Sequence, residues 1–234
     1  MPEYEPIAGS RVAFFGGSFD PPHEGHLAVA RAAREALSLD TILFAPVGAQ
    51  PLKPAGTTAL FADRVAMTEL AIGGETGFAV SLADAPCATG EPNYTLDTLL
   101  NLRNHIDTDA SLFCLMGADS LRGLRRWYRA AEIPFAAALI VASRPGEPLD
   151  NLAALMPPGL SLHTQAATTA LETYTLTNAS GATAPFYILP GLHVDISASQ
   201  IRTQLRAAYA GTAFLLPPAV ASYIAANHLY ASAD

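Results

Sequence analysis

The chain has 234 residues, of which half are hydrophobic and only 15% are charged, and its formal net charge is −8. This length and apolar content suit one substantial α/β domain with a large core and exclude a disordered chain. Nucleic acids and anionic membranes require basic surfaces, so a chain with 13 Lys plus Arg against 21 acidic residues is expected to bind neither. Small anionic substrates stay open, because they need only a local site.

No segment resembles a secretion signal or a membrane span. The N-terminal residues 1–5 are acidic, and the longest apolar run, 135–142, is too short to cross a bilayer. The two cysteines, Cys87 and Cys114, are widely spaced and form no C-x-x-C motif. We therefore expect a soluble, cytoplasmic protein.

The first half of the chain alternates between apolar runs typical of buried strands and segments with helical periodicity. This alternation favours parallel βαβ units with right-handed crossovers. In chain order, we expect strands at 12–15, 41–45, 78–82 and 111–116, with helices at 23–37, 60–73 and 93–106 between them.

The second half begins with a helical face at 121–127 and a buried strand at 135–142. From 147 to 185 the periodicity is lost, and we interpret this stretch as a variable excursion, in part ordered and in part a mobile loop. A strand at 186–189 and helices from Ser197 and Pro218 follow. The whole predicts a single Rossmann-like α/β domain over 1–234, with an open, mostly parallel sheet, helices on both faces and a C-terminal helical part.

A glycine turn and two histidines join the first strand to the first helix. The histidines are three residues apart in the first turn of that helix, so they share a face. Backbone N–H groups of the turn and the helix dipole form a phosphate cradle, and imidazoles beside it can donate to phosphate oxygens. The residues of this cradle are Gly16, Gly17, Ser18, Phe19, His23 and His26.

Two other interpretations of this stretch are weaker. The glycines could form only a turn, with the histidines as exposed helix-start residues, but the joint occurrence of all these features after a strand disfavours that. A zinc site is disfavoured because the spacing is H-x-x-H rather than H-E-x-x-H, and no cluster of Cys, His or carboxylates supplies further ligands.

Further polar groups are expected at the carboxyl ends of strands, where open α/β sheets bind ligands. Asp119 follows the best central strand and is a candidate partner for a ribose hydroxyl, with a helix N-cap as a compatible alternative. Ser197 and Gln200 have capping-box spacing, which predicts a helix start at Ser197. Ser199 and Arg202 then form a second anion site, since the planar fork of arginine donates bidentately to phosphate.

The string Gly-Ser-Phe-Asp-Pro-Pro-His-x-Gly-His resembles the first motif of the nucleotidyltransferase superfamily, whose H-x-G-H element is shared with class I aminoacyl-tRNA synthetases. Within it, the chain is most similar to the bacterial nicotinate-nucleotide adenylyltransferases, with matching motifs from 16 to about 230 apart from 147–185. The resemblance implies transfer of the adenylyl group of ATP to nicotinate mononucleotide in NAD biosynthesis. The products would be nicotinate adenine dinucleotide (deamido-NAD) and pyrophosphate, formed by in-line attack without a covalent enzyme intermediate.

The resemblance also assigns the ATP site. The second family motif, I-S-S-T-x-I-R, is matched by 196–202, which departs from it at Ala198 and, conservatively, at Ser199. It implies that this segment grips the ATP phosphates and that Asp119, in a G-x-D element, holds the adenosine ribose. The implied ATP site comprises Gly16, Gly17, Ser18, Phe19, His26, Asp119, Ile196, Ser199 and Arg202, with His23, His26 and Arg202 as catalytic residues.

The nicotinate ring and its carboxylate are assigned by resemblance to the region of Tyr94, Thr95 and Trp127. In the family these positions bind by backbone N–H groups and by stacking. For Trp127 an alternative stays open, because the spacing of Leu121, Leu124 and Trp127 is also that of an ordinary core helix.

Two basic residues complete the mononucleotide site that the resemblance implies. Lys53, the only lysine of the chain, matches the end of a P-x-x-x-P-P-H-K loop from which Gln50 and Leu52 depart. Arg144 matches an arginine that faces the nucleotide, and as a bare sequence feature it could equally form an ion pair in a loop. Mg²⁺ is expected on ATP, and no dedicated carboxylate cage for a metal is visible in the sequence.

Alternative functions come from three classes. An adenylyltransferase for nicotinamide mononucleotide or phosphopantetheine is the nearest, although phosphopantetheine enzymes usually carry threonine where His23 stands and are shorter. A non-catalytic nucleotide-binding module would not need His23, His26 and Arg202 together. An aminoacyl-tRNA synthetase is disfavoured by length, acidic charge and the lack of a K-M-S-K-S-like motif. We expect ATP and nicotinate mononucleotide as partners, and the sequence leaves a homo-oligomer open.

Overall fold

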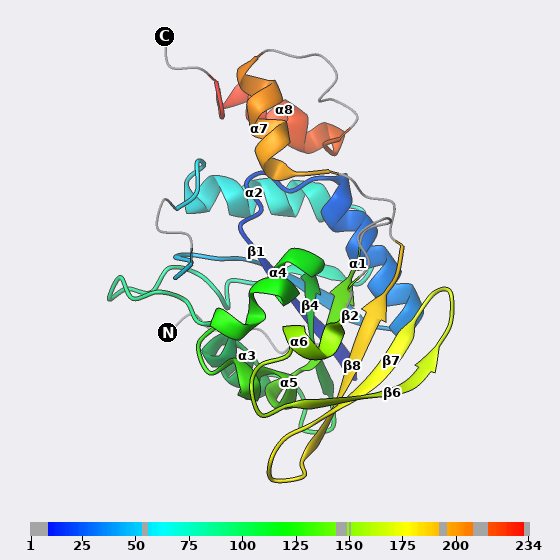
Figure 1. Ribbon diagram of the computed structural model, residues 1–234. Helices are drawn as coiled ribbons and strands as arrows, with labels where there is room; N and C mark the ends of the chain where they lie inside the picture. Colours follow the sequence, from blue (N-terminus) through cyan, green and yellow to red (C-terminus); the bar gives the residue numbers. More distant parts are fainter. Residues whose placement is uncertain are drawn as a thin grey trace.

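A mostly parallel β-sheet with helices on both faces forms the body of the molecule (Figure 1). The computed structural model describes residues 9–52, 56–143, 149, 151–191, 196–207 and 215–231. In this part of the chain the sheet has eight strands in the order β3-β2-β1-β4-β5-β8-β7-β6. The strands are β1 (Arg11–Gly17), β2 (Thr41–Pro46), β3 (Phe78–Val80), β4 (Ser111–Gly117), β5 (Ala138–Ala142), β6 (Ser161–Ala167), β7 (Glu172–Thr177) and β8 (Thr183–Leu189).

The α/β fold and the helical coverage of both faces confirm the predicted fold class. Successive residues of β1 point to opposite faces: Val12 and Phe14 pack with the helices after β3, whereas Ala13 and Phe15 pack with the first helix. The helices are α1 (Glu24–Leu37), α2 (Phe61–Ile72), α3 (Thr95–Arg103), α4 (Ala118–Gly123), α5 (Ile133–Ala136), α6 (Leu152–Leu155), α7 (Ala198–Arg206) and α8 (Pro218–Ala226). None of the helices described here is long and apolar enough to cross a membrane.

The strand order places a topological switch point between β1 and β4. The chain moves from β1 outward to β2 and β3, and then returns to the other side of β1 to form β4 and β5. Connections that leave in opposite directions open a crevice at the carboxyl ends of the two strands. Gly17 and Gly117 end these strands, so the residues that follow them border the crevice.

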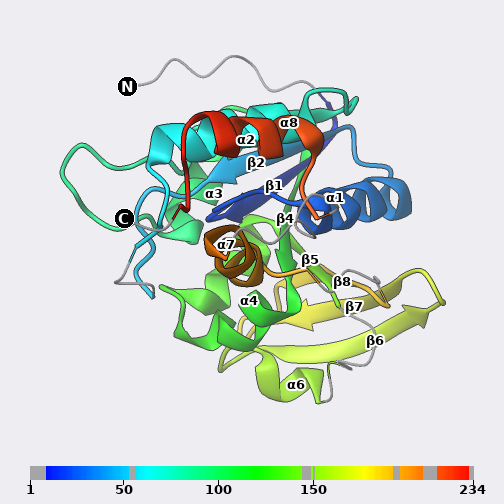
Figure 2. The same ribbon diagram turned by 90° about the horizontal axis from the view of Figure 1, so that it is seen from above.

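The last two helices lie beyond the carboxyl ends of the parallel strands, above α2 (Figure 1). Met67 of α2, Ile201 of α7, Val220 and Ile224 of α8 share a small apolar cluster with Tyr230. Seen from above, α7 lies over the ends of the central strands, beside α1 and α4 (Figure 2). The expected C-terminal helical part is therefore present, and it closes over the crevice side of the sheet.

The stretch from 147 to 185 contains two strands that the sequence analysis did not predict. Strands β6 and β7 extend the sheet beyond β8 in antiparallel fashion, and β8 begins at Thr183 rather than at 186. Their hydrophobic pattern is weak because most of β6 is exposed and β7 is half-buried. The β-branched and aromatic residues of β7 were the remaining strand signal.

The apolar run at 135–142 is shorter as a strand than expected. Its first residues belong to the short helix α5, and β5 begins only at Ala138. Pro134 lies in the first turn of α5, where its fixed φ and missing N–H are compatible with a helix. A run of apolar residues does not by itself separate a buried helix from a buried strand.

Candidate active site

Two adjoining cavities lie along the carboxyl ends of β1 and β4. One, of about 500 Å³, is lined in part by Tyr94, Trp127 and Tyr128, and we call it the aromatic cavity. The other, of about 470 Å³, is lined by residues of the first turns of α1 and α7, and we call it the polar cavity. Both cavities are bordered by Gly16, Gly17, Ser18, Met116, Asp119 and Ser120. The shared border means that two ligands could meet at the turn after β1.

His23 and His26 form a stacked pair at the start of α1. His23 is the N-cap residue, and the two ring centroids are 3.7 Å apart with 26° between the planes. The backbone N–H of His23 donates to Nδ1 of His26 at 3.1 Å. Because Nδ1 accepts this bond, the neutral ring of His26 carries its proton on Nε2.

The surroundings of His26 hold its ring neutral. Burial and, to a smaller degree, the charge of His23 lower the pKa of His26 well below 6.5. The ring packs edge-on against Phe15 and Phe19, with centroid distances of 6.1 and 4.9 Å. His26 is therefore a neutral hydrogen-bond donor at physiological pH, with both histidines lining the polar cavity.

Arg202 connects the first turns of α7 to the turn after β1. Its Nη1 donates to the carbonyl oxygen of Asp20 at 2.7 Å, and its Nη2 donates to Oγ of Ser199 at 3.2 Å. Ile196, Ser199 and Arg202 line the polar cavity opposite the histidines, so the structure brings the two predicted anion sites together. The helix does begin after Ser197, but the expected capping box is wrong, because no side-chain bond caps this end.

Asp20 belongs to the first motif, but the sequence analysis gave it no role. Its buried carboxylate accepts hydrogen bonds from the backbone N–H groups of Thr58 and Ala59, at 2.7 and 3.0 Å, and from the hydroxyl of Tyr230 at 2.7 Å. The turn after β1 is thus tied to the segment before α2 and to the end of the chain. These partners lie 38 to 210 positions away in the sequence, so no local sequence pattern predicts them.

A buried arginine bridges the segments that directly follow β1 and β2. Arg64 of α2 is 1% exposed, and its guanidinium donates to the carbonyl oxygens of Ser18 at 2.7 Å and Val47 at 2.8 Å. Desolvation by burial lowers the pKa of the Arg64 guanidinium. The helix that contains Arg64 was predicted at 60–73, but the sequence analysis assigned no role to this side chain.

Asp119 borders both cavities and is not the N-cap of the helix that follows β4. Gly117 holds the N-cap position of α4. The side chain of Asp119 is 81% exposed and lies 3.0 Å from Arg122, its neighbour one turn along the helix. The N-cap alternative is therefore wrong, and the exposed carboxylate, paired with Arg122 through Oδ1, lies at the border of the cavities.

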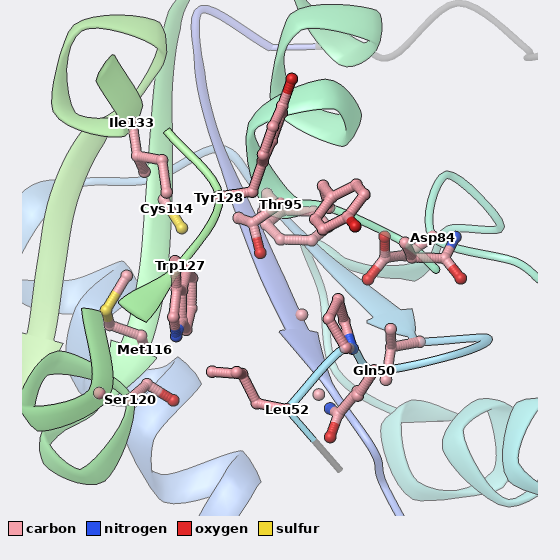
Figure 3. Close-up of a pocket in the computed structure, with 18 of the residues that line it drawn as sticks. Gln50, Leu52, Asp84, Thr95, Cys114, Met116, Ser120, Trp127, Tyr128 and Ile133 are labelled. Carbon is pink, nitrogen blue, oxygen red and sulfur yellow. The ribbon is translucent and has the colours of Figure 1, made fainter. Parts of the chain in front are cut away.

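The aromatic cavity is built from the start of α3 and the segment after α4. Thr95 is the first residue of α3, and Tyr94 is its N-cap. The backbone N–H groups of the first turn of α3 therefore point toward the aromatic cavity. Trp127 does not continue a helix, because it follows the 3-10 turn Leu124–Arg126 in extended conformation and lines the cavity (Figure 3). The alternative that Trp127 continues a core helix is therefore wrong for the backbone, although its partly buried side chain does pack against the core. The rings of Tyr94 and Tyr128 pair with centroids 4.6 Å apart.

A buried carboxyl group, Asp84, lies at the far wall of the aromatic cavity (Figure 3). It accepts a hydrogen bond from the hydroxyl of Thr98 at 2.7 Å. Burial raises the pKa of Asp84 to about 6, and burial together with the charge of Asp84 raises the pKa of Cys114 to about 12. The sequence analysis missed Asp84, because it lies in a loop without periodicity.

Two predicted residues, Lys53 and Arg144, lie outside the described residues. Within the described part of the chain, no three His, Cys, Asp or Glu side chains are grouped so that they could hold a metal ion.

The switch point, the glycine turn and the facing starts of α1 and α7 define a nucleotide-binding α/β protein of the nucleotidyltransferase type. A model of the cytidylyltransferase-like family matches residues 14–204. A relative from Gloeobacter violaceus is 40% identical over 95% of this chain and 97% of its own, and one from Laribacter hongkongensis is 38% identical over 94% of each. Both carry the name "Probable nicotinate-nucleotide adenylyltransferase".

The solved structures agree on the fold. The Plasmodium falciparum nicotinic acid mononucleotide adenylyltransferase complexed with NaAD superposes with a TM-score of 0.67 at 16% identity, over 95% of this chain and 98% of that one. The chain belongs to the cytidylyltransferase-like family and, within it, to the nicotinate-nucleotide adenylyltransferases.

Proposed function

We propose that the protein transfers the adenylyl group of ATP to nicotinate mononucleotide, yielding nicotinate adenine dinucleotide and pyrophosphate. The observation that carries this proposal is the pair of cavities with a shared border: one is polar and lies between two helix starts, and the other is aromatic. A transfer between two nucleotides needs two such sites whose reacting ends meet. The family membership and the names of the relatives support the same reaction.

ATP is assigned to the polar cavity. Its phosphates would lie between the turn at 16–19 and the first turns of α1 and α7, where helix dipoles favour negative charge. His26 would donate through Nε2–H, and Arg202 would add its positive charge from the opposite side. Asp119, at the border of the cavities, is placed to accept from the adenosine ribose hydroxyls.

The mononucleotide is assigned to the aromatic cavity. The pyridine ring would stack on Trp127, and its carboxylate would accept from backbone N–H groups at Thr95, the first residue of α3. The mononucleotide phosphate would then reach the shared border near Gly16 and Gly17. Lys53 and Arg144 stay predictions for this site.

The chemistry follows from alignment and charge stabilisation. A phosphate oxygen of the mononucleotide attacks the α-phosphorus of ATP, a new P–O bond forms, and the bond to the β-phosphate oxygen breaks, its electron pair leaving with pyrophosphate. No side-chain nucleophile takes part. His26, His23 and Arg202 would stabilise the negative charge that develops on the transferring group.

Mg²⁺ is expected to enter with ATP, where it neutralises phosphate charge. Both carboxylate oxygens of Asp20, the buried acid beside the polar cavity, already accept hydrogen bonds. The phosphate oxygens and water would therefore supply most of the ligands of the ion. The expected cytoplasmic location, the absence of nucleic-acid binding and a homo-oligomer stay predictions.

Pyrophosphate release from ATP tests the proposal directly, with nicotinate mononucleotide, nicotinamide mononucleotide and phosphopantetheine as alternative acceptors. We expect turnover with the nicotinate compound to exceed that with the other two. Equal or greater turnover with the amide would overturn the nicotinate assignment. No pyrophosphate with any acceptor would favour a nucleotide-binding module instead.

A further inference from the structure

The loop that follows β2 is fastened to the wall of the aromatic cavity before it reaches Leu52. The N–H of Gly48 donates to the carbonyl oxygen of Asp84 at 2.7 Å. Ala49 and Asn93 exchange two bonds: the Ala49 N–H donates to Oδ1 of Asn93, and the Asn93 N–H donates to the carbonyl of Ala49, each at 2.9 Å. These bonds fix the direction in which the next three residues leave the wall.

The backbone of the loop at Gly48 lies so close to Pro86 and Asn93 that it requires a glycine. A β-carbon added to Gly48 would lie 2.5 Å from the backbone of Pro86 and 2.7 Å from Oδ1 of Asn93. Only glycine lets the loop lie this near to the segment before α3. The loop is therefore held against the same segment that positions Tyr94 at the start of α3.

Leu52, at the end of the anchored stretch, is an exposed leucine that lines the aromatic cavity. Its side chain is 48% exposed and extends across the cavity toward Trp127 (Figure 3). The two side chains come from opposite sides of the sheet's switch point, one from the loop after β2 and the other from the segment after α4. An isobutyl group and an indole face thus border the same space, and both are apolar.

We propose that Leu52 is the second wall of the mononucleotide pocket, so that the pyridine ring lies between Leu52 and Trp127. This inference rests on the proposed function and names a specificity residue for it. The N-glycosylated pyridine ring of the mononucleotide is flat and cationic, which suits the indole face on one side. On the other side, the branched aliphatic group of Leu52 covers the ring and excludes water, and it carries no charge that would repel the cationic ring.

Trp127 makes the proposal measurable without turnover, because it is the only tryptophan of the chain. Its fluorescence, titrated with nicotinate mononucleotide in the absence of ATP, reports occupancy of the aromatic cavity. We expect L52A to weaken mononucleotide binding by roughly 5–30-fold, the effect of losing a leucine contact with the ring. L52M, which keeps an apolar group of similar volume, should bind within about threefold of the wild type.

Leu60 supplies the matched control. It is also an exposed leucine, at 76%, but it lies just before α2 and is not among the residues that line either cavity. L60A should leave mononucleotide binding unchanged. In steady-state assays, L52A should raise KM for the mononucleotide while the KM for ATP stays within about twofold.

The outcomes separate this inference from the proposed function. If the wild type releases pyrophosphate and binds the mononucleotide, but L52A binds as tightly as L60A, Leu52 is not a wall of the mononucleotide pocket. The proposed function is then unaffected. An equal rise of both KM values in L52A also overturns the wall, because a displaced loop and not a ring contact would then explain it. Absence of mononucleotide binding together with absence of pyrophosphate release by the wild type would overturn both proposals.

Discussion

His26 combines two properties that a phosphate donor needs at neutral pH. The bond from the His23 N–H to Nδ1 fixes the tautomer, and burial lowers the pKa, so the ring offers Nε2–H without taking up a second proton. We expect His26→Ala to lower kcat by about 10²–10⁴-fold, the scale for a removed donor in a transition state. Pyrophosphate release under saturating substrates measures this effect.

The control for His26 is His163, an exposed histidine on β6. His163→Ala should keep full activity, and circular dichroism should show both variants folded. A folded His26→Ala protein with wild-type kcat would remove His26 from the catalytic assignment.

Asp84 links the aromatic cavity to the pH dependence of stability. Its carboxyl has a pKa of about 6 in the folded protein against an ordinary value of 3.8, so the folded state holds the proton more tightly. Its contribution to stability is therefore present below about pH 4 and is lost as the pH rises through 6. Asp84→Asn should raise the free energy of unfolding at pH 8 by about 1–3 kcal/mol and leave it nearly unchanged at pH 4.

Urea unfolding at both pH values measures the Asp84 effect, with the exposed Asp109→Asn as control. The amide oxygen can still accept from the Thr98 hydroxyl, so the variant removes the charge and keeps the bond. An equal change in the free energy of unfolding at pH 8 and at pH 4 would show that the pKa of Asp84 is not held above its ordinary value.

Among the elements, α2 has a positioning function that no sequence pattern shows. Arg64 bridges the carbonyl oxygens of Ser18 and Val47, so it holds the turn after β1 at a fixed distance from the loop after β2. Arg64→Met would remove the guanidinium donor from the buried carbonyl of Val47 and from the half-buried carbonyl of Ser18, and we expect a loss of about 2–4 kcal/mol in the free energy of unfolding. Both KM values should rise, because each cavity borders one or both of these loops.

Arg103→Met is the matched control for the Arg64 prediction. Arg103 lies on the exposed side of α3 and donates to one carbonyl, that of Ala110, at 2.7 Å. Its replacement should cost less than about 1 kcal/mol in chemical denaturation. An Arg64→Met protein as stable as Arg103→Met would contradict the bridging function.

Elements with strong periodicity were predictable, and elements with a weak pattern were not. The helix 60–73 and the strand 111–116 were placed within two residues, because their buried faces repeat at the expected spacing. Strand β6 was not predicted, since its side chains are mostly exposed on an added antiparallel edge. Trp127 was placed on a helical face that ends before it, because the 3-10 turn at Leu124–Arg126 keeps the apolar spacing while changing the backbone.

At the scale of the whole molecule, the site residues that lie close together in the sequence were predictable, whereas those brought together only by tertiary packing were not. The glycine turn and His26 lie within one motif, so their joint presence near a strand end was readable. The bond of Asp20 with Tyr230 joins positions 210 residues apart and depends on the packing of α7 and α8 over α2. The resemblance to the family assigned the residues of the mononucleotide site. The direction of the backbone N–H groups at the start of α3 was visible only in the structure.

The end of the chain is coupled to the turn after β1 by the Tyr230 hydroxyl. Burial and the Asp20 carboxylate raise the pKa of Tyr230, so the hydroxyl stays protonated and donates. Tyr230→Phe deletes this donor and leaves the Thr58 and Ala59 N–H groups, with the Arg202 guanidinium at 3.9 Å, to hold a buried carboxylate. We expect a loss of about 1.5–3 kcal/mol in the free energy of unfolding, the range for a hydrogen bond to a charged group.

The same substitution should lower kcat more than it raises either KM, because Asp20 also presents its carbonyl to Arg202. Tyr223→Phe is the control, since its hydroxyl donates to Asp63 at 3.0 Å away from both cavities. Thermal unfolding and steady-state kinetics on the two variants distinguish an effect on stability from an effect on the position of Arg202. If both lose the same stability and neither loses kcat, the C-terminal contact stabilises the fold alone and does not position Arg202.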